Sequence, residues 1–384
     1  MLTNEQISAL RSRFPILREK TYLYNCSQGA LSDAAETGMR TYMESWRTSN
    51  APWNDWMEVY DGLRADFARF LNARPDEVAI VTSASAGINA IASALDFAAR
   101  PKVVMGEYEF PTMGHIWLAQ QKRGAQIEFL QGADNAIALE AYERAIDNRT
   151  AIVPLTQVSF LNGFRADFEA ITKMAHDRGA LLFMDGFQDC GTRPVDVKAM
   201  DVDFYVTGTL KYLLGPSGVA FLYVKRSLIE QLIPTVTSWM AQRDVFAYNT
   251  QKLDPASEAR RFEGGSPPIP NIYMARPALQ LLLGIGMENV AAQIAQLTSR
   301  FLHGVQALGI ASKTADDSAG PLVVLRSANP AALVEKLTQA GIVVSARQDG
   351  VRFSFHFYNH AADVDHTLSV LARNLPLLVP VASE

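Results

Sequence analysis

The chain has 384 residues, of which 48% are hydrophobic and 20% are charged, as in an ordinary soluble protein long enough for a large domain and a smaller one. A net charge of −5 argues against nucleic acid or an anionic membrane as the main partner. The first 20 residues are mixed and charged, and no apolar run has the length of a membrane span. Because Cys26 and Cys190 form neither a disulfide nor a metal pattern, we expect a cytoplasmic protein.

Apolar runs alternate with helical patterns over most of the chain. We predict strands at 78–82, 102–106, 125–130, 151–158, 180–185, 202–207 and 218–224, with helices at 87–98, 113–122, 139–146 and 167–178 between them. This alternation indicates an α/β fold in which helices cover both faces of a mostly parallel seven-stranded sheet.

The pattern changes after a stretch rich in glycine and proline at 264–270, which we predict to be a loop. The remainder predicts long helices at 273–283 and 287–308, strands at 322–325, 343–346 and 351–357, and helices at 331–340 and 361–375. We therefore expect a large domain over residues 15–272 and a smaller α+β domain formed by residues 1–14 and 273–384.

Two residues at strand ends indicate a particular chemistry. One apolar strand runs into Asp185, and the next leads to Lys211 in a turn of small residues. The aldehyde of pyridoxal 5'-phosphate (PLP) needs an amine for a Schiff base, and its pyridine nitrogen needs an anion to stay protonated. The sequence thus predicts a PLP site in which Lys211 and Asp185 are catalytic. The alternatives are a solvated lysine and an aspartate that caps a helix.

Three motifs in this order resemble the class V aminotransferases of the type I PLP fold, which include cysteine desulfurases, kynureninases and isopenicillin-N-epimerase-like enzymes. They are MDGFQDCGTRPVDVKAMDVDFYV followed by the lysine, then RFEGGSP, then VRFSFHFYN. The resemblance covers nearly the whole chain and implies the type I PLP-transferase fold. It also implies that Gln188 donates to the phenolic oxygen of the cofactor.

A phosphate needs backbone N–H groups at a helix start, together with hydroxyls. We expect Ser83, Ala84 and Ser85 to supply them, where the family has a Gly-Thr-Thr type of turn; the alternative is a plain helix cap. Near the lysine, many desulfurases have a histidine where this chain has Leu210, so Thr209 or Thr207 must supply any hydroxyl there. The resemblance further implies a homodimer with shared sites, in which Ser266 reaches the phosphate of the partner.

Three further positions either depart from the pattern of the relatives or are expected to bind the substrate. Phe110 stands where desulfurases have a histidine, and we expect it to stack on the pyridine ring, although a core phenylalanine is the alternative. Phe160 replaces an asparagine, which leaves either a more apolar wall or a role for Asn162. Arg352 aligns with the arginine that binds the substrate carboxylate, and a guanidinium suits that role because it binds in two parallel hydrogen bonds.

Three functions stay open on the sequence alone. The first is an aminotransferase acting on an α-amino acid, and the second is a lyase acting at the β or γ carbon. The resemblance implies that a cysteine desulfurase would carry its nucleophilic cysteine on a loop between strands of the last domain. The corresponding segment, 343–352, contains no cysteine, and we expect Cys26 and Cys190 to lie elsewhere, so a persulfide mechanism is disfavoured. The third is a PLP-fold binding protein without catalysis. The closely spaced histidines His356, His360 and His366 lack paired ligands, so we expect no metal.

Overall fold

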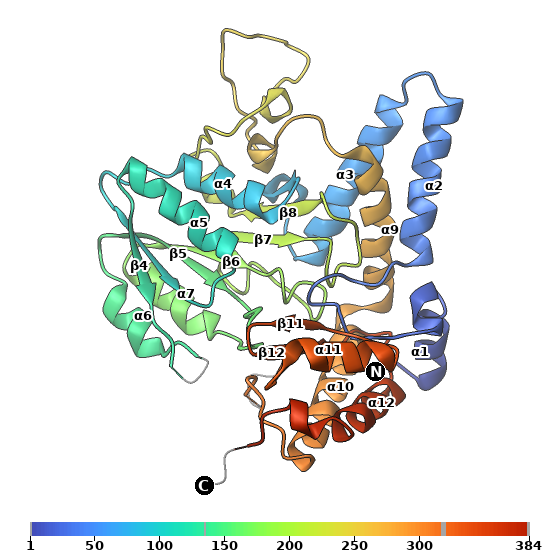
Figure 1. Cartoon of the computed structure of the whole chain (residues 1–384). Helices are drawn as coiled ribbons and strands as arrows, with labels where there is room; N and C mark the ends of the chain where they lie inside the picture. The colour runs from blue at the N-terminus through green and yellow to red at the C-terminus, as the bar shows by residue number, and fades with distance from the viewer. Residues whose placement is uncertain (1, 134–135, 316–319, 382–384) are drawn as a thin grey trace.

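The computed structural model describes residues 2–133, 136–315 and 320–381, and a seven-stranded sheet forms its centre (Figure 1). The strands are β2 (Val78–Val81), β3 (Lys102–Gly106), β4 (Gln126–Leu130), β5 (Thr150–Thr156), β6 (Leu181–Asp185), β7 (Phe204–Gly208) and β8 (Ala220–Val224). Their order is β2-β8-β7-β6-β5-β3-β4; β8 is antiparallel to both neighbours, and the other pairs are parallel. The predicted fold class is confirmed.

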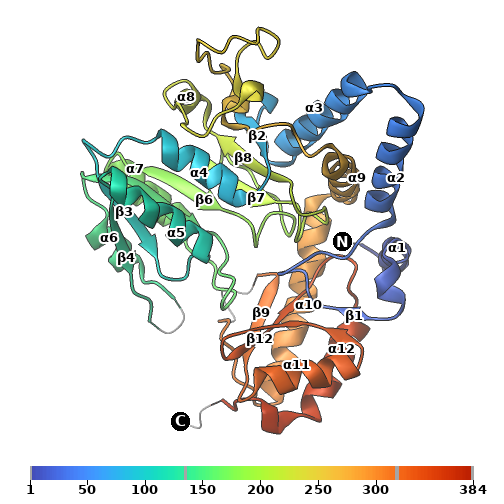
Figure 2. The same cartoon turned by 45° about the horizontal axis from the view of Figure 1, so that its top comes forward.

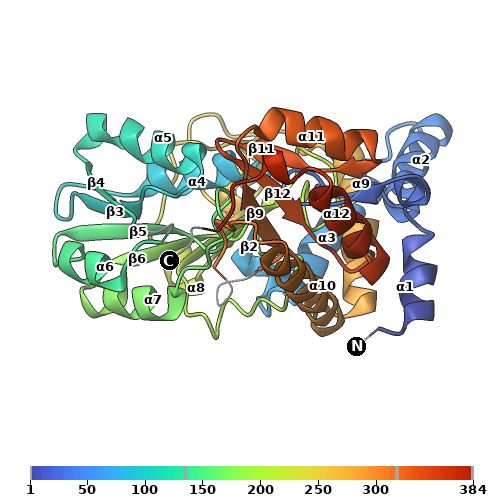
Figure 3. The ribbon, with the colours of Figure 1, turned by 60° about the horizontal axis from the view of Figure 1, so that its bottom comes forward.

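Both faces of this sheet are buried, which is why its strands are nearly continuous apolar runs in the sequence. Successive residues of a strand point to opposite faces. Phe183 packs in one core cluster, while Leu182 and Met184 pack in another. The helices on the Phe183 face are α4 (Ala84–Ala94) and α5 (Pro111–Ala119), and those on the opposite face are α6 (Leu139–Ala145) and α7 (Phe168–Asp177) (Figure 3).

Three long helices stand side by side at one end of the sheet: α2 (Asp33–Thr48), α3 (Trp53–Phe70) and α9 (Ile269–Ile285) (Figure 1). Helix α3 packs against β2, and α9 contacts both α3 and α2. Helix α9 begins at Ile269, so Pro270 lies in its first turn and the predicted loop is too long there. A proline is tolerated at this point because the first N–H groups of a helix have no intrahelical partner. The predicted domain boundary, between residues 272 and 273, falls within α9 and stays a prediction.

A three-stranded antiparallel sheet in the order β11-β12-β9 forms the smaller unit at the bottom of Figure 2. Its elements are α10 (Met287–Ala307), β9 (Leu322–Arg326), α11 (Pro330–Gln339), β11 (Ser345–Arg347), β12 (Gly350–Ser354) and α12 (Ala361–Ala372). Within the described residues no single helix has the length and apolar character of a membrane span; α9 and α10 pass that test only together, with a bend of 80° between them.

The N-terminal segment packs on this smaller unit after α1 (Asn4–Arg11). Strand β1 (Thr21–Tyr22) pairs in parallel with β10 (Ile342–Val343). The contact therefore continues beyond residue 14, the predicted limit of the N-terminal contribution.

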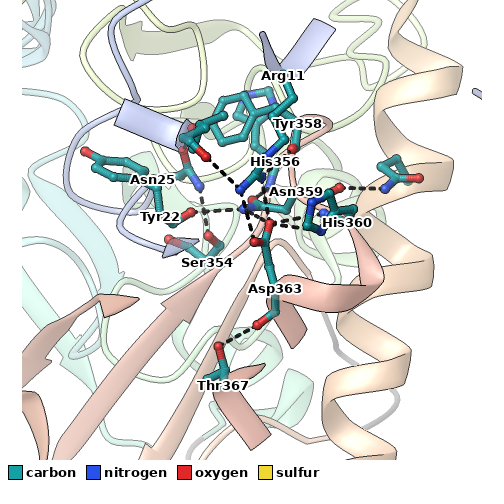
Figure 4. A network of polar contacts seen from close by, with 12 residues as sticks. Arg11, Tyr22, Asn25, Ser354, His356, Tyr358, Asn359, His360, Asp363 and Thr367 are labelled. Atoms are coloured by element: carbon teal, nitrogen blue, oxygen red, sulfur yellow. Dashed lines mark hydrogen bonds and ion pairs between the residues drawn. The ribbon is translucent and has the colours of Figure 1, made fainter. Parts of the chain in front are cut away.

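A buried polar network fixes the segment that follows β1 (Figure 4). Asn25 donates through Nδ2 to the Ser354 carbonyl at 2.8 Å, and the Tyr358 hydroxyl donates to the Asn25 side-chain oxygen. Asn359 donates to the Tyr22 carbonyl at 3.1 Å. These bonds come from the FSFHFYN part of the third motif, and they hold the next N-terminal residues against β12.

Candidate active site

A cavity of about 450 Å³ opens at the carboxyl ends of the parallel strands, between the large sheet and the β11–β12 hairpin. Crevices at this edge are the usual ligand sites of α/β folds, and the volume is typical of a small-molecule pocket. The cavity brings together most of the predicted site residues: Ser83, Ala84, Ser85, Phe110, Asp185, Gln188, Lys211 and Arg352.

Lys211 lies in this cavity, three residues beyond the end of β7. Its Nζ is 4.3 Å from the centroid of the Phe187 ring and 5.9 Å from that of Phe110. Burial lowers the pKa of this amine from 10.5 to about 8; Asp185 opposes the change, while Arg352 adds to it. An unprotonated amine, the form that attacks an aldehyde, is therefore accessible near neutral pH.

The loop that carries Lys211 is held by backbone bonds on both sides. Leu214 donates to the Lys211 carbonyl at 3.1 Å, and Gly29 donates to the Leu210 carbonyl at 2.8 Å. Leu214 has φ of 60°, an unfavourable conformation for a residue with a branched side chain. The lysine is thus presented by a fixed turn rather than by a flexible one.

Thr209 belongs to this loop and does not line the cavity. Its hydroxyl donates to the Pro216 carbonyl at 2.5 Å, and the Val219 carbonyl is 3.1 Å away. The Thr209 hydroxyl thus lies in the turn that holds Lys211, and its contact with the phosphate stays a prediction. Thr207, the other candidate, is buried on β7 and does not line the cavity either.

Asp185 ends β6 and lies one strand away from the lysine loop. Burial raises the pKa of its carboxyl, and the Phe187 N–H, which donates to Oδ1 at 2.9 Å, and Lys211 act in the opposite direction. A buried carboxylate needs a cationic partner to stay ionised. A protonated pyridine nitrogen would be such a partner.

Gln188 lies in the same wall, beside Cys26. Its Nε2 donates to the Cys26 carbonyl at 3.0 Å, which leaves a second N–H on that nitrogen. Its Oε1 is buried, and no partner for it occurs among the described residues. A side-chain amide that is only partly satisfied in a cavity wall fits a site built to hold a polar ligand.

The first residues of α4 form another part of the wall. Ser83 is the N-cap, and its hydroxyl accepts a bond from the Ala86 N–H at 3.1 Å. Ser83, Ala84 and Ser85 line the cavity, so the positive end of this helix faces it. This is the arrangement that binds an anion such as a phosphate group.

The aromatic side of the cavity is formed by Phe110 and Phe160, whose ring centroids lie 5.0 Å apart in an edge-to-face arrangement. Phe110 is 44% exposed, so it is a wall residue rather than part of the core. Phe160 makes this part of the wall apolar, which is one of the two alternatives that the sequence left open. Asn162 does not line the cavity; its side chain accepts the Phe164 N–H at 3.0 Å.

Arg352 on β12 is 2% exposed and held at three points. Its Nε donates to the Ser345 hydroxyl at 3.0 Å, Nη1 to the Phe160 carbonyl at 3.2 Å and Nη2 to the Ser27 hydroxyl at 2.6 Å. Because a guanidinium has five N–H donors, one remains on each terminal nitrogen. Two N–H donors on one guanidinium are the kind of pair that can bind a carboxylate in two parallel hydrogen bonds.

His356 supports the lysine turn from behind. Its Nε2 donates to the Tyr212 carbonyl at 2.9 Å, while Nδ1 accepts the Phe357 N–H at 2.8 Å. Burial lowers the pKa of this imidazole to about 4, so it is neutral near pH 7. No group of three or more potential metal ligands occurs in the part of the chain that the structure describes.

Sequence reasoning missed several residues of the wall, among them Tyr24, Cys26, Ser27, Phe187 and Arg347. Cys26 was expected to lie away from the 343–352 segment, but its sulfur is 3.8 Å from the Ser345 hydroxyl. Ser266, in contrast, is exposed and does not line the cavity of this chain. For Cys26 and Ser27, the run of small polar residues around them is the sequence feature that could have indicated a place in the cavity wall.

Fold and site together define an enzyme built around a buried lysine, an aspartate, a helix N-terminus and an arginine. A family model described as Aminotransferase class-V matches residues 31–367, and the chain belongs to this family. A Bacillus subtilis protein described as an uncharacterized aminotransferase is 31% identical over 365 residues, covering 94% of this chain and 96% of the relative. A Streptomyces coelicolor relative described as a probable cysteine desulfurase is 27% identical, with 93% of this chain and 94% of the relative covered. A Deinococcus radiodurans relative described as a kynureninase is 26% identical, with 96% of each chain covered.

The solved structures that resemble this chain share its fold. A cysteine desulfurase from Thermococcus onnurineus has a TM-score of 0.89 and 22% identity, with 98% of this chain and 99% of that chain covered. A variant of the enzyme C-DES, solved with glycine linked covalently to its PLP cofactor, has a TM-score of 0.87 and 22% identity, with 94% and 98% covered. Family membership makes the protein a class V enzyme with PLP as its cofactor.

The residues present fit this cofactor. Lys211 offers the amine, Asp185 an anion for the ring nitrogen, the start of α4 a phosphate cradle and Phe110 an aromatic face. When bound, the cofactor supplies an aldehyde that captures amines and a protonated ring that accepts electrons from the substrate.

Proposed function

We propose that the protein is an aminotransferase that acts on an α-amino acid. The observation that carries this proposal is the composition of the cavity wall: among the described residues that line it, Lys211 is the one amine and none is a histidine. Transamination needs a single base that takes the proton from the α carbon of the amino acid and returns it at a neighbouring position. Arg352 supports an α-amino acid because its free fork suits the α-carboxylate.

Phe110 has no acid–base group, so the face of a cofactor ring stacked against it would meet no side chain that can transfer a proton. This favours Lys211 as the group that moves the proton in either direction. Arg352 binds and orients the substrate, and the apolar surfaces of Phe110 and Phe160 exclude water from the reacting atoms.

A lyase that eliminates a group from the β or γ carbon is the second candidate, because it needs the same lysine and arginine, Lys211 and Arg352, in the cavity wall. Cys26 also lines the cavity, but its thiol is 1% exposed and contacts Ser345, so it lacks the freedom that a persulfide-forming nucleophile requires. An elimination that needs no thiol remains compatible with the same wall.

Product analysis separates these functions. The purified protein with PLP is incubated with a panel of amino acids, with and without pyruvate or 2-oxoglutarate, and keto acid, ammonia and sulfide are measured. If the protein is an aminotransferase, many molecules of keto acid should form per molecule of protein only when an acceptor is present. Ammonia, sulfide or a cleaved side chain without an acceptor would establish the lyase, and an unchanged visible spectrum with every amino acid would indicate a binding protein. Lys211→Ala is the control for background reaction.

We also propose that the protein is cytoplasmic and forms a homodimer. In this dimer Ser266 of one subunit would reach the phosphate group of the cofactor bound by the other. The loop that carries Ser266 projects outward: Gly264 and Gly265 are exposed and have open space where a Cβ would stand. Sedimentation of the protein, with Ser266→Ala tested for retention of PLP, checks this arrangement.

A further inference from the structure

A second arginine, Arg347, shares the face of the β11–β12 hairpin that carries Arg352. In the register of this hairpin Ser345 lies opposite Arg352, and Arg347 lies opposite Gly350. Positions two residues apart on a strand point to the same face, so the two arginines are diagonal neighbours, with backbones roughly 7–8 Å apart. Both line the cavity.

The two guanidinium groups differ in how they are held. Arg352 is buried and bonded at three points, whereas Arg347 is exposed and donates only to the adjacent Ala346 carbonyl, at 2.7 Å, among the bonds found in the described residues. The nearby Asp349 does not neutralise it, since Lys313 pairs with that carboxylate at 2.6 Å. Arg347 therefore has no carboxylate partner in the described part of the chain.

Among the charged side chains of the cavity wall, Arg347 is the one to which the proposed function gives no ligand. The cationic side chains are Lys211, Arg347 and Arg352, and Asp185 is the one carboxylate among the described lining residues. In the proposed function Lys211 and Asp185 contact the cofactor, the start of α4 binds its phosphate, and Arg352 binds the α-carboxylate of the substrate. Arg347 also acts on the reacting end of the site, because its charge contributes to the lowered pKa of Lys211. One cation at the mouth thus remains for another anionic group.

We propose that Arg347 binds a second carboxylate, so that the substrates are dicarboxylic amino acids or their keto acids. This inference rests on the proposed function, and it names the substrate class of the same site. A guanidinium fork matches a carboxylate in two parallel bonds. The α-carboxylate would lie on the buried guanidinium of Arg352, and the distal carboxylate would extend along the same hairpin face to the exposed guanidinium of Arg347.

The first test is a spectral titration of the PLP-bound protein with L-glutamate, L-aspartate and the uncharged L-norvaline. The wild type should respond to one of the dicarboxylic amino acids at a concentration at least about tenfold lower than to norvaline. Arg347→Gln should lose this preference: its response to the dicarboxylic amino acid should weaken roughly ten- to a hundredfold, and its response to norvaline should change far less. Arg347→Lys should restore part of the preference. Arg373→Gln, which changes an exposed arginine on the far end of α12, is the matched control.

The second test does not depend on catalysis and so distinguishes the two proposals. Calorimetry measures the binding of glutarate and succinate, with butyrate as the monocarboxylate, to the PLP-bound wild type and to Arg347→Gln. Tighter binding of a dicarboxylate that is lost in Arg347→Gln supports the inference even if no amino acid is transaminated. Equal binding of butyrate and the dicarboxylates, an equal loss for norvaline and glutamate in Arg347→Gln, or loss of PLP from that variant would overturn it.

Discussion

The Nζ of Lys211 lies over the ring of Phe187, 4.3 Å from its centroid. Gly208 makes room for that ring, because a Cβ at Gly208 would come within 2.4 Å of it. An aromatic face tolerates a cation but does not neutralise it as a carboxylate would. The amine is therefore desolvated without a strong ion pair, and this accounts for its lowered pKa.

The rate at which cofactor-free protein captures PLP should depend on this pKa. The amine must lose its proton before it attacks the aldehyde, so the rate should rise with pH and level off above about pH 8 rather than above 10. Stopped-flow mixing with PLP between pH 6 and 9.5 measures the profile. A rate that keeps rising tenfold per pH unit up to 9.5 would show a solvated lysine.

Replacing Asp185 should separate cofactor retention from turnover. Asp185→Asn keeps the shape of the site but removes the anion that we propose keeps the ring nitrogen of PLP protonated. We expect PLP to remain bound and turnover to fall by on the order of a hundredfold or more. Steady-state assays with PLP content measured on the same samples check this, and near wild-type turnover would make Asp185 structural.

The substrate carboxylate should depend on the fork of Arg352. Arg352→Ala removes two charge-assisted bonds, so the apparent affinity for an amino acid should fall by roughly ten- to a hundredfold or more. Arg352→Lys keeps the charge but cannot form the fork, and it should recover only part of the loss. Spectral titration of the three proteins with the same amino acid gives the comparison, and equal affinities would contradict the clamp.

His356 should make the folded state sensitive to acid. Its pKa is about 4 when folded and about 6.5 when unfolded, so the unfolded chain binds the proton more tightly. The stabilising effect of a neutral His356 is therefore complete above pH 6.5 and disappears as the pH falls toward 4, a change of about 3 kcal/mol. Urea unfolding of the wild type and of His356→Gln at several pH values tests this. The wild type should lose more stability than the variant over that range, and parallel curves would refute the role.

The parts of the site carried by neighbouring strands were predictable from the sequence. Asp185 and Lys211 follow strands that lie side by side, and the carboxyl ends of parallel strands meet at one edge of a sheet. Ser83 was predictable for a similar reason, since the start of a helix that follows a strand reaches the same edge.

Residues brought in by long-range contacts were not predictable. Cys26 meets Ser345 across 319 residues of sequence, through a network that only the folded chain reveals. Thr209 has the right residue type and position for a phosphate ligand, but its hydroxyl closes its own turn. Pro270 read as a loop residue, yet the first turn of a helix accepts proline. In each case tertiary packing, rather than the local sequence, decides where the residue lies.

The most direct test of the account is to locate the covalent attachment of the cofactor. The wild type and Lys211→Ala are loaded with PLP, reduced with borohydride, digested and mapped by mass spectrometry. We expect the phosphopyridoxyl mass on Lys211 in the wild type and no modified lysine in the variant, which should still bind PLP reversibly. Attachment to a different lysine, or a wild type that binds no PLP, would contradict the central claim that Lys211 is the catalytic amine.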